Sequence, residues 1–455
     1  MPIRLAAKTM AVLAILTLIG TQTVWAEGGR IFLPLVSGFQ PGNEQQVEAA
    51  GAQSCDVRVN NTTNKLQECV TVAGVREHQL ALQAIADANN GTRAAGTPGY
   101  DQSVAYVVGR LQAAGYQVTM QEFPFFAWRP EGPSTLAQIT PLPAVYGEDV
   151  DFTLLSQTEG GVVTAAVRAV DLQLGPGNTS SSGCEAADFA GFPPGQIALL
   201  QPGACTFQIK AENAAAAGAV GAIIFNQGNS ADRTGLVNAT LSAAYAGGIP
   251  AIFATYDRGV EWANTPSLTM RMAIDVYRGP ATAANVLAET PGGRADNVVM
   301  VGAHLDSVPR GPGIQDNGSG SAAILEVAEQ MRKVAPWNKV RFAWWGAEES
   351  GLVGSAYYVD QLTQAERDRI VLYLNFDMIG SPNYVRFVYD GDGSAFGLAG
   401  PSGSNVIEQF FAGFYAARGL AFESTQIDFR SDYAAFFNAG IPFGGLFTGA
   451  EGIKT

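Results

Sequence analysis

The feature that most constrains this chain is an alternation of strand-like and helix-like segments from residue 273 onward. The runs Val298–Gly302, Val340–Trp345 and Ile370–Phe376 are short and almost wholly apolar, as strands buried on both faces are. Between the first two lies Ser321–Met331, which has a helical pattern. Alternation of this kind predicts an α/β fold, with a mixed, largely parallel, twisted sheet and helices on both faces.

Polar groups follow each of these strands directly. They are His304 and Asp306 after the first strand, Asp316 in the next loop, Glu348 and Glu349 after the second strand, and Asp377 after the third. One acidic residue at such a place is usually a helix cap or a solvated loop residue. In an open α/β sheet, however, ligands bind beyond the carboxyl ends of the strands. We therefore expect this succession of groups to converge on one crevice.

The residue types in this set indicate metal chemistry. A histidine with several carboxylates suits zinc in a catalytic site. The tandem Glu348 and Glu349 indicate two tasks, one as metal ligand and one as base. His304 and Asp306 share one face of a strand, so the carboxylate is placed to orient the imidazole. The chain's other histidine, His78, lies in a predicted helix without suitable acidic companions, and we interpret it as structural.

The first residues have the pattern of an export signal. Arg4 and Lys8 precede the apolar run Met10–Gly20, and Ala26 offers a cleavage position. We predict a signal peptide over residues 1–26 and a secreted, extracellular product. The alternative, an uncleaved membrane anchor, is disfavoured because a membrane span needs about 20 apolar residues. Residues 27–74 read as a spacer or pro-segment.

Composition divides the rest of the chain. Residues 75–133 and 273–455 are predicted to form one domain in two parts, and residues 134–272, where Gly, Pro and Ser separate short strand-like runs, form an inserted α/β module. Four cysteines in an exported chain indicate disulfides. Of the three possible pairings we favour those between near neighbours, Cys55 with Cys69 and Cys184 with Cys205. A thiolate metal site is disfavoured because no Cys-x-x-Cys spacing occurs.

Taken together, the motifs resemble those of the M28 family of di-zinc aminopeptidases. They are His304-Leu-Asp306, Asp316-Asn-Gly-Ser-Gly320, Glu348-Glu349-Ser-Gly351 and Asn375-Phe-Asp377-Met-Ile-Gly380. The segments 93–99 and 429–432 also match, so the resemblance spans roughly residues 75–455. The inserted module resembles the protease-associated (PA) domain, through residues 183–189, 197–201, 205–207 and 216–219. Secreted bacterial and fungal members of the family carry such an insertion.

The resemblance implies a zinc-peptidase-like fold and a secreted aminopeptidase that hydrolyses the N-terminal peptide bond of peptides, with preference for large apolar N-terminal residues. It implies two zinc ions per complete enzyme, a metal-bridged water as nucleophile and a typically cis peptide bond between Asp316 and Asn317. By this resemblance, Asp316 would bridge the two ions, His304 and Asp377 would bind one of them, and Glu349 would bind the other. Glu348 would be the general base, and Asp306 would orient His304. Arg430 and Phe447 would line the substrate pocket.

One element of the family pattern is missing. The second zinc ion needs a fifth ligand, a histidine usually found in a Tyr-His pair near the C-terminus, and this sequence has no candidate for it. We therefore interpret the sequence as a C-terminally truncated enzyme whose second zinc site lacks its histidine. Replacement of that ligand by Asp428 or Glu451 is the alternative.

Composition also limits the partners. Lysine and arginine number 27 against 41 acidic residues, a net charge of −14, so no nucleic-acid partner is expected. We expect a monomer that acts on peptide or protein N-termini and does not associate with membranes after signal cleavage. Two other functions stay open. One is a secreted zinc carboxypeptidase or dipeptidase of the same fold, with Arg430 holding the substrate carboxylate. The other is a non-catalytic, receptor-like ectodomain.

Overall fold

The structure, a computed structural model, describes residues 23–26, 29–32, 55 and 57–450. Most of the predicted signal peptide and much of the predicted spacer lie outside these ranges. The strands β1 (Thr23–Ala26) and β2 (Gly29–Phe32) pair with each other in antiparallel fashion. Within the described ranges, no helix combines the length and the apolar character needed to cross a membrane.

The chain forms two compact units. The described residues up to 125 and from 281 onward make up the first unit, and residues 126–280 make up the second, which is inserted into the first. The strands β3 (Val118–Pro130) and β12 (Val276–Glu289) each carry the chain from one unit to the other. The predicted insertion, residues 134–272, lies inside the second unit.

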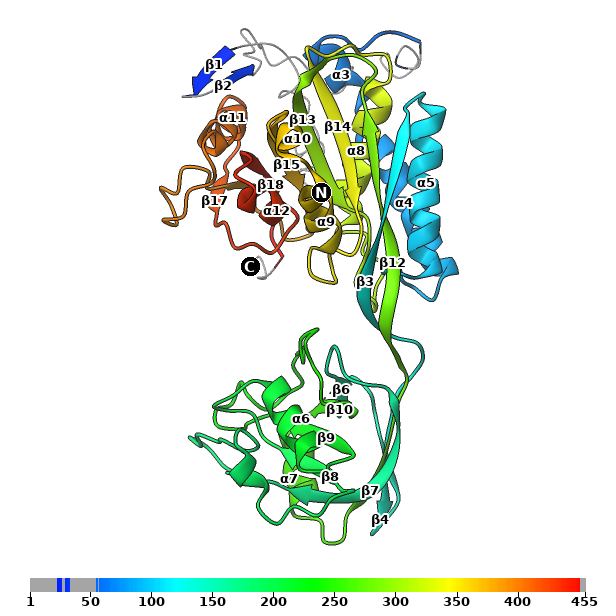
Figure 1. Cartoon of the computed structure of the whole chain (residues 1–455), viewed down its shortest axis with the longest axis vertical. Coiled ribbons are helices and arrows are strands. Elements are labelled where there is room, and N and C mark those ends of the chain that lie inside the picture. The colour runs from blue at the N-terminus through cyan, green and yellow to red at the C-terminus, as the bar shows by residue number, and fades with distance from the viewer. Residues whose placement is uncertain (1–22, 27–28, 33–54, 56, 451–455) are drawn as a thin grey trace. The chain divides into compact units, whose positions relative to one another are not determined.

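An eight-stranded mixed sheet forms the centre of the first unit (Figure 1). Its four middle strands are parallel: β14 (Asn338–Trp345), β13 (Arg294–His304), β15 (Ile370–Phe376) and β18 (Phe443–Phe447). These strands are buried along most of their length, which explains their continuous apolar runs. The strands β12 and β3 complete one side of the sheet, and β16 (Phe387–Tyr389) and β17 (Glu423–Thr425) complete the other.

Helices cover both faces of this sheet, as the alternation predicts. The helices α8 (Gly318–Met331) and α11 (Ser404–Ala416) contact one face, and α4 (Val72–Ala88) and α5 (Pro98–Ala113) pack against α8. The helices α9 (Val353–Gln361) and α12 (Tyr433–Asn438) cover the other face, where Phe436 stacks on Tyr373 with ring centroids 3.8 Å apart. The short helices α3 (Thr63–Cys69) and α10 (Gln364–Arg367) lie at the periphery.

The helices α4 and α5 follow each other in the sequence, and each has a threonine at its amino end. Thr71 caps the amino end of α4, and Thr97 caps α5, with Pro98 in the first turn, where a missing backbone N–H costs nothing. The residues between the helices form a turn that ends at this cap. The segment 89–97 is therefore a loop between two packed helices.

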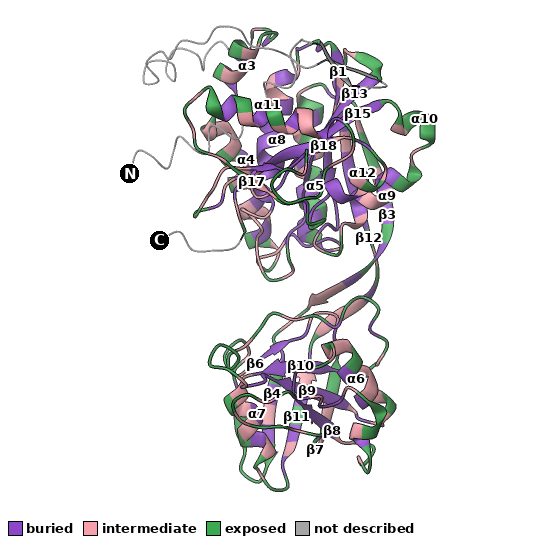
Figure 2. Cartoon of the chain, turned by 90° about the vertical axis from the view of Figure 1, so that its left-hand side faces the viewer, coloured by how far each residue is buried: buried purple, intermediate pink, exposed green. Residues whose placement is uncertain are grey.

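The second unit is also built on an eight-stranded mixed sheet. Its parallel strands are β7 (Gly161–Ala169), β8 (Ile197–Leu200), β9 (Gly221–Phe225) and β10 (Ala251–Ala254), and they are flanked by β4 (Thr135–Thr140), β5 (Ala144–Tyr146), β6 (Phe152–Leu154) and β11 (Thr269–Ile274). The helices are α6 (Phe207–Ala216), α7 (Tyr256–Ala263) and the 3₁₀ turn η1 (Ala186–Phe189). Figure 2 shows the buried central strands of each unit in purple.

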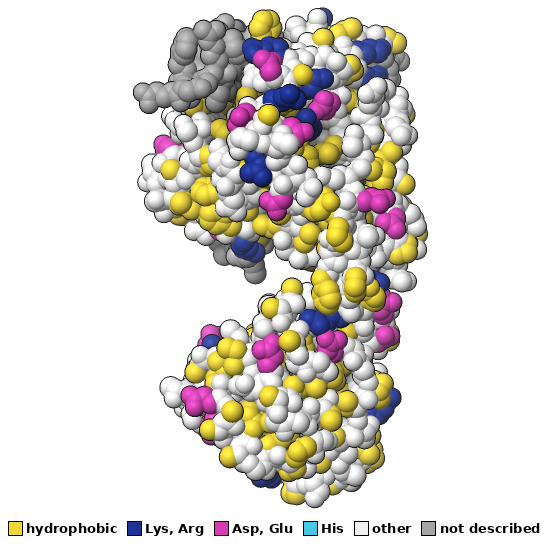
Figure 3. Space-filling model, in the orientation of Figure 1, with side chains coloured by type: hydrophobic (Ala, Val, Ile, Leu, Met, Phe, Trp, Pro, Cys, Tyr) yellow, Lys and Arg dark blue, Asp and Glu magenta, His cyan; other side chains and the backbone are white. Residues whose placement is uncertain are grey.

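Both predicted disulfides are confirmed. Cys55 pairs with Cys69 in the first unit, and Cys184 pairs with Cys205 in the second. Each bond links residues that are close in sequence and ties a local loop. On the face of the molecule that Figure 3 shows, lysine and arginine side chains lie among acidic ones, which fits the mixed charge of the sequence.

Candidate metal centre

The acidic groups predicted from the sequence meet at one edge of the first unit's sheet. His304 is the last residue of β13, Asp377 follows β15 directly, and Glu348 and Glu349 lie in the turn after β14. Asp316 stands just before α8. Because β13, β14 and β15 are parallel, their carboxyl ends lie side by side, and residues far apart in the sequence converge.

Three of these side chains form a cluster with metal-ligand spacing. His304 Nε2 lies 3.1 Å from Asp316 Oδ1 and 3.3 Å from Asp377 Oδ1. One donor atom from each of the three residues lies within 4.8 Å of the others. Glu348 Oε2 is 3.8 Å from the same His304 nitrogen. The base expected from the tandem motif therefore stands beside the cluster.

Two carboxylate oxygens at this centre fit a bound cation. Asp377 Oδ1 and Glu349 Oε1 are buried, and neither has a hydrogen-bond donor among the described residues. A buried carboxylate oxygen without a donor is costly unless a positive charge lies nearby. A histidine nitrogen and carboxylate oxygens are also the donors that zinc takes in catalytic sites. The residues present therefore fit a metal ion of this class.

Asp306 connects the histidine to the tandem glutamates. Its Oδ1 accepts the backbone N–H of Glu348 at 3.1 Å, and its Oδ2 accepts that of Glu349 at 3.3 Å. His304 Nδ1 lies 3.2 Å from the Asp306 carbonyl oxygen and 3.6 Å from the carboxylate. Asp306 thus contacts the imidazole mainly through its backbone, while its carboxylate holds the turn that carries Glu348 and Glu349.

Asn317 holds the segment that carries the proposed ligand Asp377. Its Nδ2 donates to the Phe376 carbonyl at 2.9 Å, and its Oδ1 accepts the N–H of Met378 at 3.2 Å, so it spans the segment that holds Asp377. The Asp316–Asn317 peptide bond is cis, as expected. A Cβ at Gly320 would lie 2.0 Å from the Phe376 carbonyl oxygen, so glycine is required for this close approach of α8.

Residues with no assigned role in the sequence interpretation complete the centre. Ser431 donates to Asp377 Oδ2 at 2.6 Å, and Asn375 donates to the Ser431 hydroxyl at 2.9 Å. Ser431 belongs to the segment 429–432, whose match to the family motif was the available signal. Asp432 is fully buried, and burial raises its pKa to about 7.

Burial and mutual repulsion shift the titration of these groups. Burial, reinforced by Asp377, raises the pKa of Glu348 well above its usual range, although His304 opposes the shift. Burial also raises the pKa of Glu349 to about 8. For His304, burial opposes the charged form, but the nearby Glu348 and Asp377 outweigh it and raise the pKa. A raised carboxylate pKa is the property that a general base at neutral pH requires.

A cavity of about 390 Å³ opens over the centre. It is lined by Asp316, Glu348, Glu349 and Asp377, and by the two residues predicted to contact substrate, Arg430 and Phe447. Tyr389 and Phe429 add aromatic surface to its wall. The cavity is therefore acidic at the metal ligands and has aromatic surface beside them.

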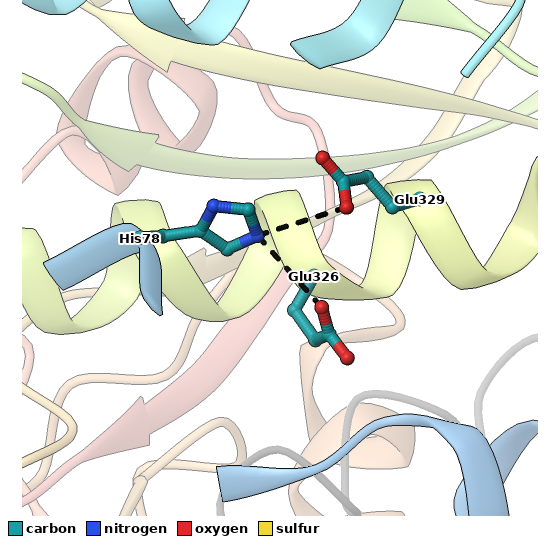
Figure 4. A group of neighbouring side chains, drawn as sticks. All are labelled: His78, Glu326 and Glu329. Carbon is teal, nitrogen blue, oxygen red and sulfur yellow. Dashed lines mark ion pairs between the residues drawn. The ribbon is translucent and has the colours of Figure 1, made fainter. Parts of the chain in front are cut away.

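His78 lies apart from this centre, on α4. The prediction that it lacks acidic companions is wrong, because its Nε2 is 3.7 Å from Glu326 and 3.9 Å from Glu329 (Figure 4). Both glutamates come from α8, some 250 residues further along the chain, so no local pattern could reveal them.

Comparison with known proteins gives relatives for both units. Residues 285–453 match the model of peptidase family M28, and residues 163–262 match that of the PA domain. An aminopeptidase of Pseudomonas aeruginosa (strain UCBPP-PA14) is 60% identical over 390 residues, which cover 86% of this chain and 73% of that protein. Leucine aminopeptidase 2 of Trichophyton equinum is 37% identical over 406 residues, covering 88% of this chain and 76% of that protein.

Solved structures show the same architecture. An aminopeptidase from Aneurinibacillus sp. strain AM-1 superposes with a TM-score of 0.61 at 27% identity, covering 82% of this chain and 85% of that one. A zinc aminopeptidase from Bacillus subtilis superposes with a TM-score of 0.61 at 25% identity, covering 84% and 87%. The sequence identity, the matched segments and the converging ligands lead to one conclusion: the chain belongs to peptidase family M28, as a metallo-aminopeptidase with an inserted PA domain.

Proposed function

We propose that this chain is a zinc-dependent aminopeptidase whose reaction takes place in the cavity over His304, Asp316 and Asp377. The observation that carries the proposal is a pair of buried oxygens, on Asp377 and Glu349, for which the described residues offer no hydrogen-bond donor. Asp377 Oδ1 lies 3.3 Å from His304 Nε2. When bound, zinc lowers the pKa of a water molecule and polarises the carbonyl of the bond to be cleaved. Ligands for it would be His304, Asp316, Asp377 and Glu349.

We infer that the enzyme works with two zinc ions. Asp316 would bridge them, His304 and Asp377 would hold one, and Glu349 would hold the other. The histidine expected for the second ion is absent from this sequence, whose two histidines are His78 and His304. We therefore expect the 455-residue chain to hold its first zinc tightly and its second weakly.

Glu348 would move the proton. Its carboxylate lies within 3.8 Å of His304 Nε2, and its pKa is raised by burial and by Asp377. It would take a proton from the attacking water and pass it to the leaving amine. Asp306 supports this role because it holds the backbone N–H of Glu348 at 3.1 Å.

The cavity suits the N-terminus of a peptide. The carboxylates that line it would attract the substrate's α-ammonium group. Phe447, Phe429 and Tyr389 offer aromatic surface to a large apolar side chain. Arg430 would stand beside the bound substrate. We accordingly expect preference for Leu, Phe or Met at the first position, and activity on the N-termini of both peptides and proteins.

We further propose that the enzyme acts as a secreted monomer. The two disulfides favour an oxidising compartment, in which such bonds persist. The predicted signal peptide, residues 1–26, would direct the export.

Hydrolysis of leucine p-nitroanilide tests the function. With excess Zn²⁺ present to fill the weak second site, we expect activity that is lost after dialysis against 1,10-phenanthroline and restored by Zn²⁺, and no cleavage of the N-acetylated substrate. Cleavage of a blocked peptide from its carboxyl end would support the carboxypeptidase alternative instead. A chain shown to hold two zinc ions that still hydrolyses neither substrate would support the receptor-like alternative.

A further inference from the structure

A second group of metal-ligating side chains lies between α4 and α8, outside the cavity. It consists of His78 from α4 and Glu326 and Glu329 from α8, which stand one helical turn apart (Figure 4). One donor atom of each lies within 4.8 Å of the others. The group is buried, with side-chain exposures of 1% for His78, 5% for Glu326 and 13% for Glu329.

The imidazole points at both carboxylates but bonds to neither. His78 Nε2 is 3.7 Å from Glu326 Oε2 and 3.9 Å from Glu329 Oε2, beyond hydrogen-bond range, and it has no other partner among the described residues. Two donors bound to one zinc ion at about 2.1 Å each can be up to about 4.2 Å apart. The observed separations therefore leave room for an ion between these atoms.

The other ring nitrogen is held as in a metal-bound histidine. His78 Nδ1 lies 2.8 Å from the hydroxyl of Tyr106 on α5. That oxygen can accept the Nδ1 proton and leave the Nε2 lone pair free toward the glutamates. The ring is also packed edge-on against Tyr106, with centroids 6.0 Å apart, which fixes its orientation.

Glu326 needs a positive charge that its hydrogen bonds do not supply. Among the described residues, its Oε1 receives two long contacts, from the Thr71 N–H and from Gln330 Nε2, both at 3.4 Å. Its Oε2 faces His78. A Cβ at Gly74 would lie 2.4 Å from the Glu326 carboxyl carbon, so α4 has a glycine where this carboxylate fits.

The charge around the group is negative overall. Arg110 contacts both oxygens of Glu329, at 2.6 and 2.8 Å, and is shared with Glu77 at 2.5 Å. Arg110 thus pairs with two carboxylates, and Glu326 adds a third carboxylate to the group. The charges of Arg110, Glu77, Glu326 and Glu329 sum to a net charge that one divalent cation would cancel. Each Glu329 oxygen keeps a second lone pair for such an ion.

We propose that His78, Glu326 and Glu329 form a structural binding site for a zinc ion, separate from the catalytic centre. The donor set of one imidazole nitrogen and two carboxylate oxygens is one that zinc takes, and calcium or magnesium would require oxygen donors alone. Water would complete the coordination from the side of Glu329, the most exposed of the three. The ion would join α4 to α8, and through Tyr106 and Arg110 also to α5.

Zinc counting on the full chain tests this site. Protein freed of metal, loaded with ZnCl₂ and passed through a desalting column is compared as wild type, His78→Gln and Glu77→Gln. The last variant is the matched control, because it removes a charge from the same network but no ligand. We expect His78→Gln to bind one zinc fewer per chain than wild type and Glu77→Gln to bind the same number. Equal counts in all three proteins would overturn the proposal.

Crystals of the wild-type chain soaked in ZnCl₂ provide a measurement that does not depend on the folding of a variant. Anomalous diffraction at the zinc edge should give a peak between His78 and Glu326 in addition to any at His304. A peak at His304 alone would overturn the proposal of a second zinc site. A peak at His78 without one at His304 would leave this site standing and overturn the catalytic proposal.

Discussion

The carboxylate of Asp306 accepts the backbone N–H of Glu348 through a 3.1 Å hydrogen bond. A residue that follows β13 thus holds the turn that follows the neighbouring strand β14. Its second oxygen takes the N–H of Glu349 at 3.3 Å. A single side chain therefore aligns the proposed base and one proposed ligand with His304.

Replacement of the Asp306 carboxylate should disturb the positions of Glu348, the proposed base, and Glu349, a proposed ligand, at the same time. In Asp306→Asn one amide oxygen remains, and the new NH₂ group faces a backbone donor that it cannot bond. We expect kcat/KM for leucine p-nitroanilide to fall about 10- to 100-fold, with weaker zinc binding, as for other residues that support metal ligands. Zinc titration against a competing chelator gives the affinity. Unchanged values of both quantities would contradict the positioning role.

Glu348→Gln should separate chemistry from metal binding. The amide cannot accept the water's proton, so we expect kcat to fall by about 10² to 10⁴ with little change in KM. Glu349→Gln is the control on the neighbouring residue, and we expect it to lose zinc. Metal analysis and steady-state kinetics of the two variants distinguish the cases. Zinc loss in Glu348→Gln would reverse the assigned roles.

Arg93 is expected to be essential for the loop between two ligands. It is fully buried and donates to the carbonyls of Pro312 at 2.8 Å and Gly313 at 2.9 Å, and also to that of Leu305. Lysine cannot make this forked set of bonds. At roughly 1.5 kcal/mol for each charged hydrogen bond, losing two of them in Arg93→Lys should lower the free energy of unfolding by about 3 kcal/mol. Urea denaturation measures the change, and Arg76→Lys, on the same unit, serves as the control.

The second unit should become more stable as the pH rises above 8. Burial lowers the pKa of Lys210 to about 8 from its usual 10.5, while its Nζ donates to the Ser182 carbonyl at 2.5 Å. Between these two pH values the unfolded chain binds more protons than the folded one. The free energy of unfolding therefore rises with pH, by at most about 1.4 kcal/mol per unit from this group.

Denaturation curves at pH 7.5, 8.5 and 9.5 compare wild type with Lys210→Met, which removes the titrating amine. We expect the rise to be smaller in the variant by the contribution of Lys210. Parallel pH profiles for the two proteins would show that Lys210 is not the source.

Features that depend on local sequence pattern could be predicted, and contacts between segments distant in the sequence could not. The strands of the parallel core are recognisable because burial on both faces makes their apolar runs continuous, and β15 has the predicted bounds Ile370–Phe376. The residues after those strands are predictable because strand ends share an edge. The contact of Ser431 with Asp377, and of Glu326 with His78, joins segments with no common periodicity, so only the folded chain reveals it.

The place where the second unit enters the first has a consequence for how such enzymes diversify. The strands β3 and β12, through which the chain leaves and returns, are neighbours at one end of the sheet. For the catalytic unit, residues 126–280 are thus topologically one long loop between adjacent strands. Loops of that kind can be lengthened, shortened or exchanged without rerouting the strands that carry the ligands. The inserted PA domain can therefore change in evolution independently of the strands that carry the proposed metal ligands.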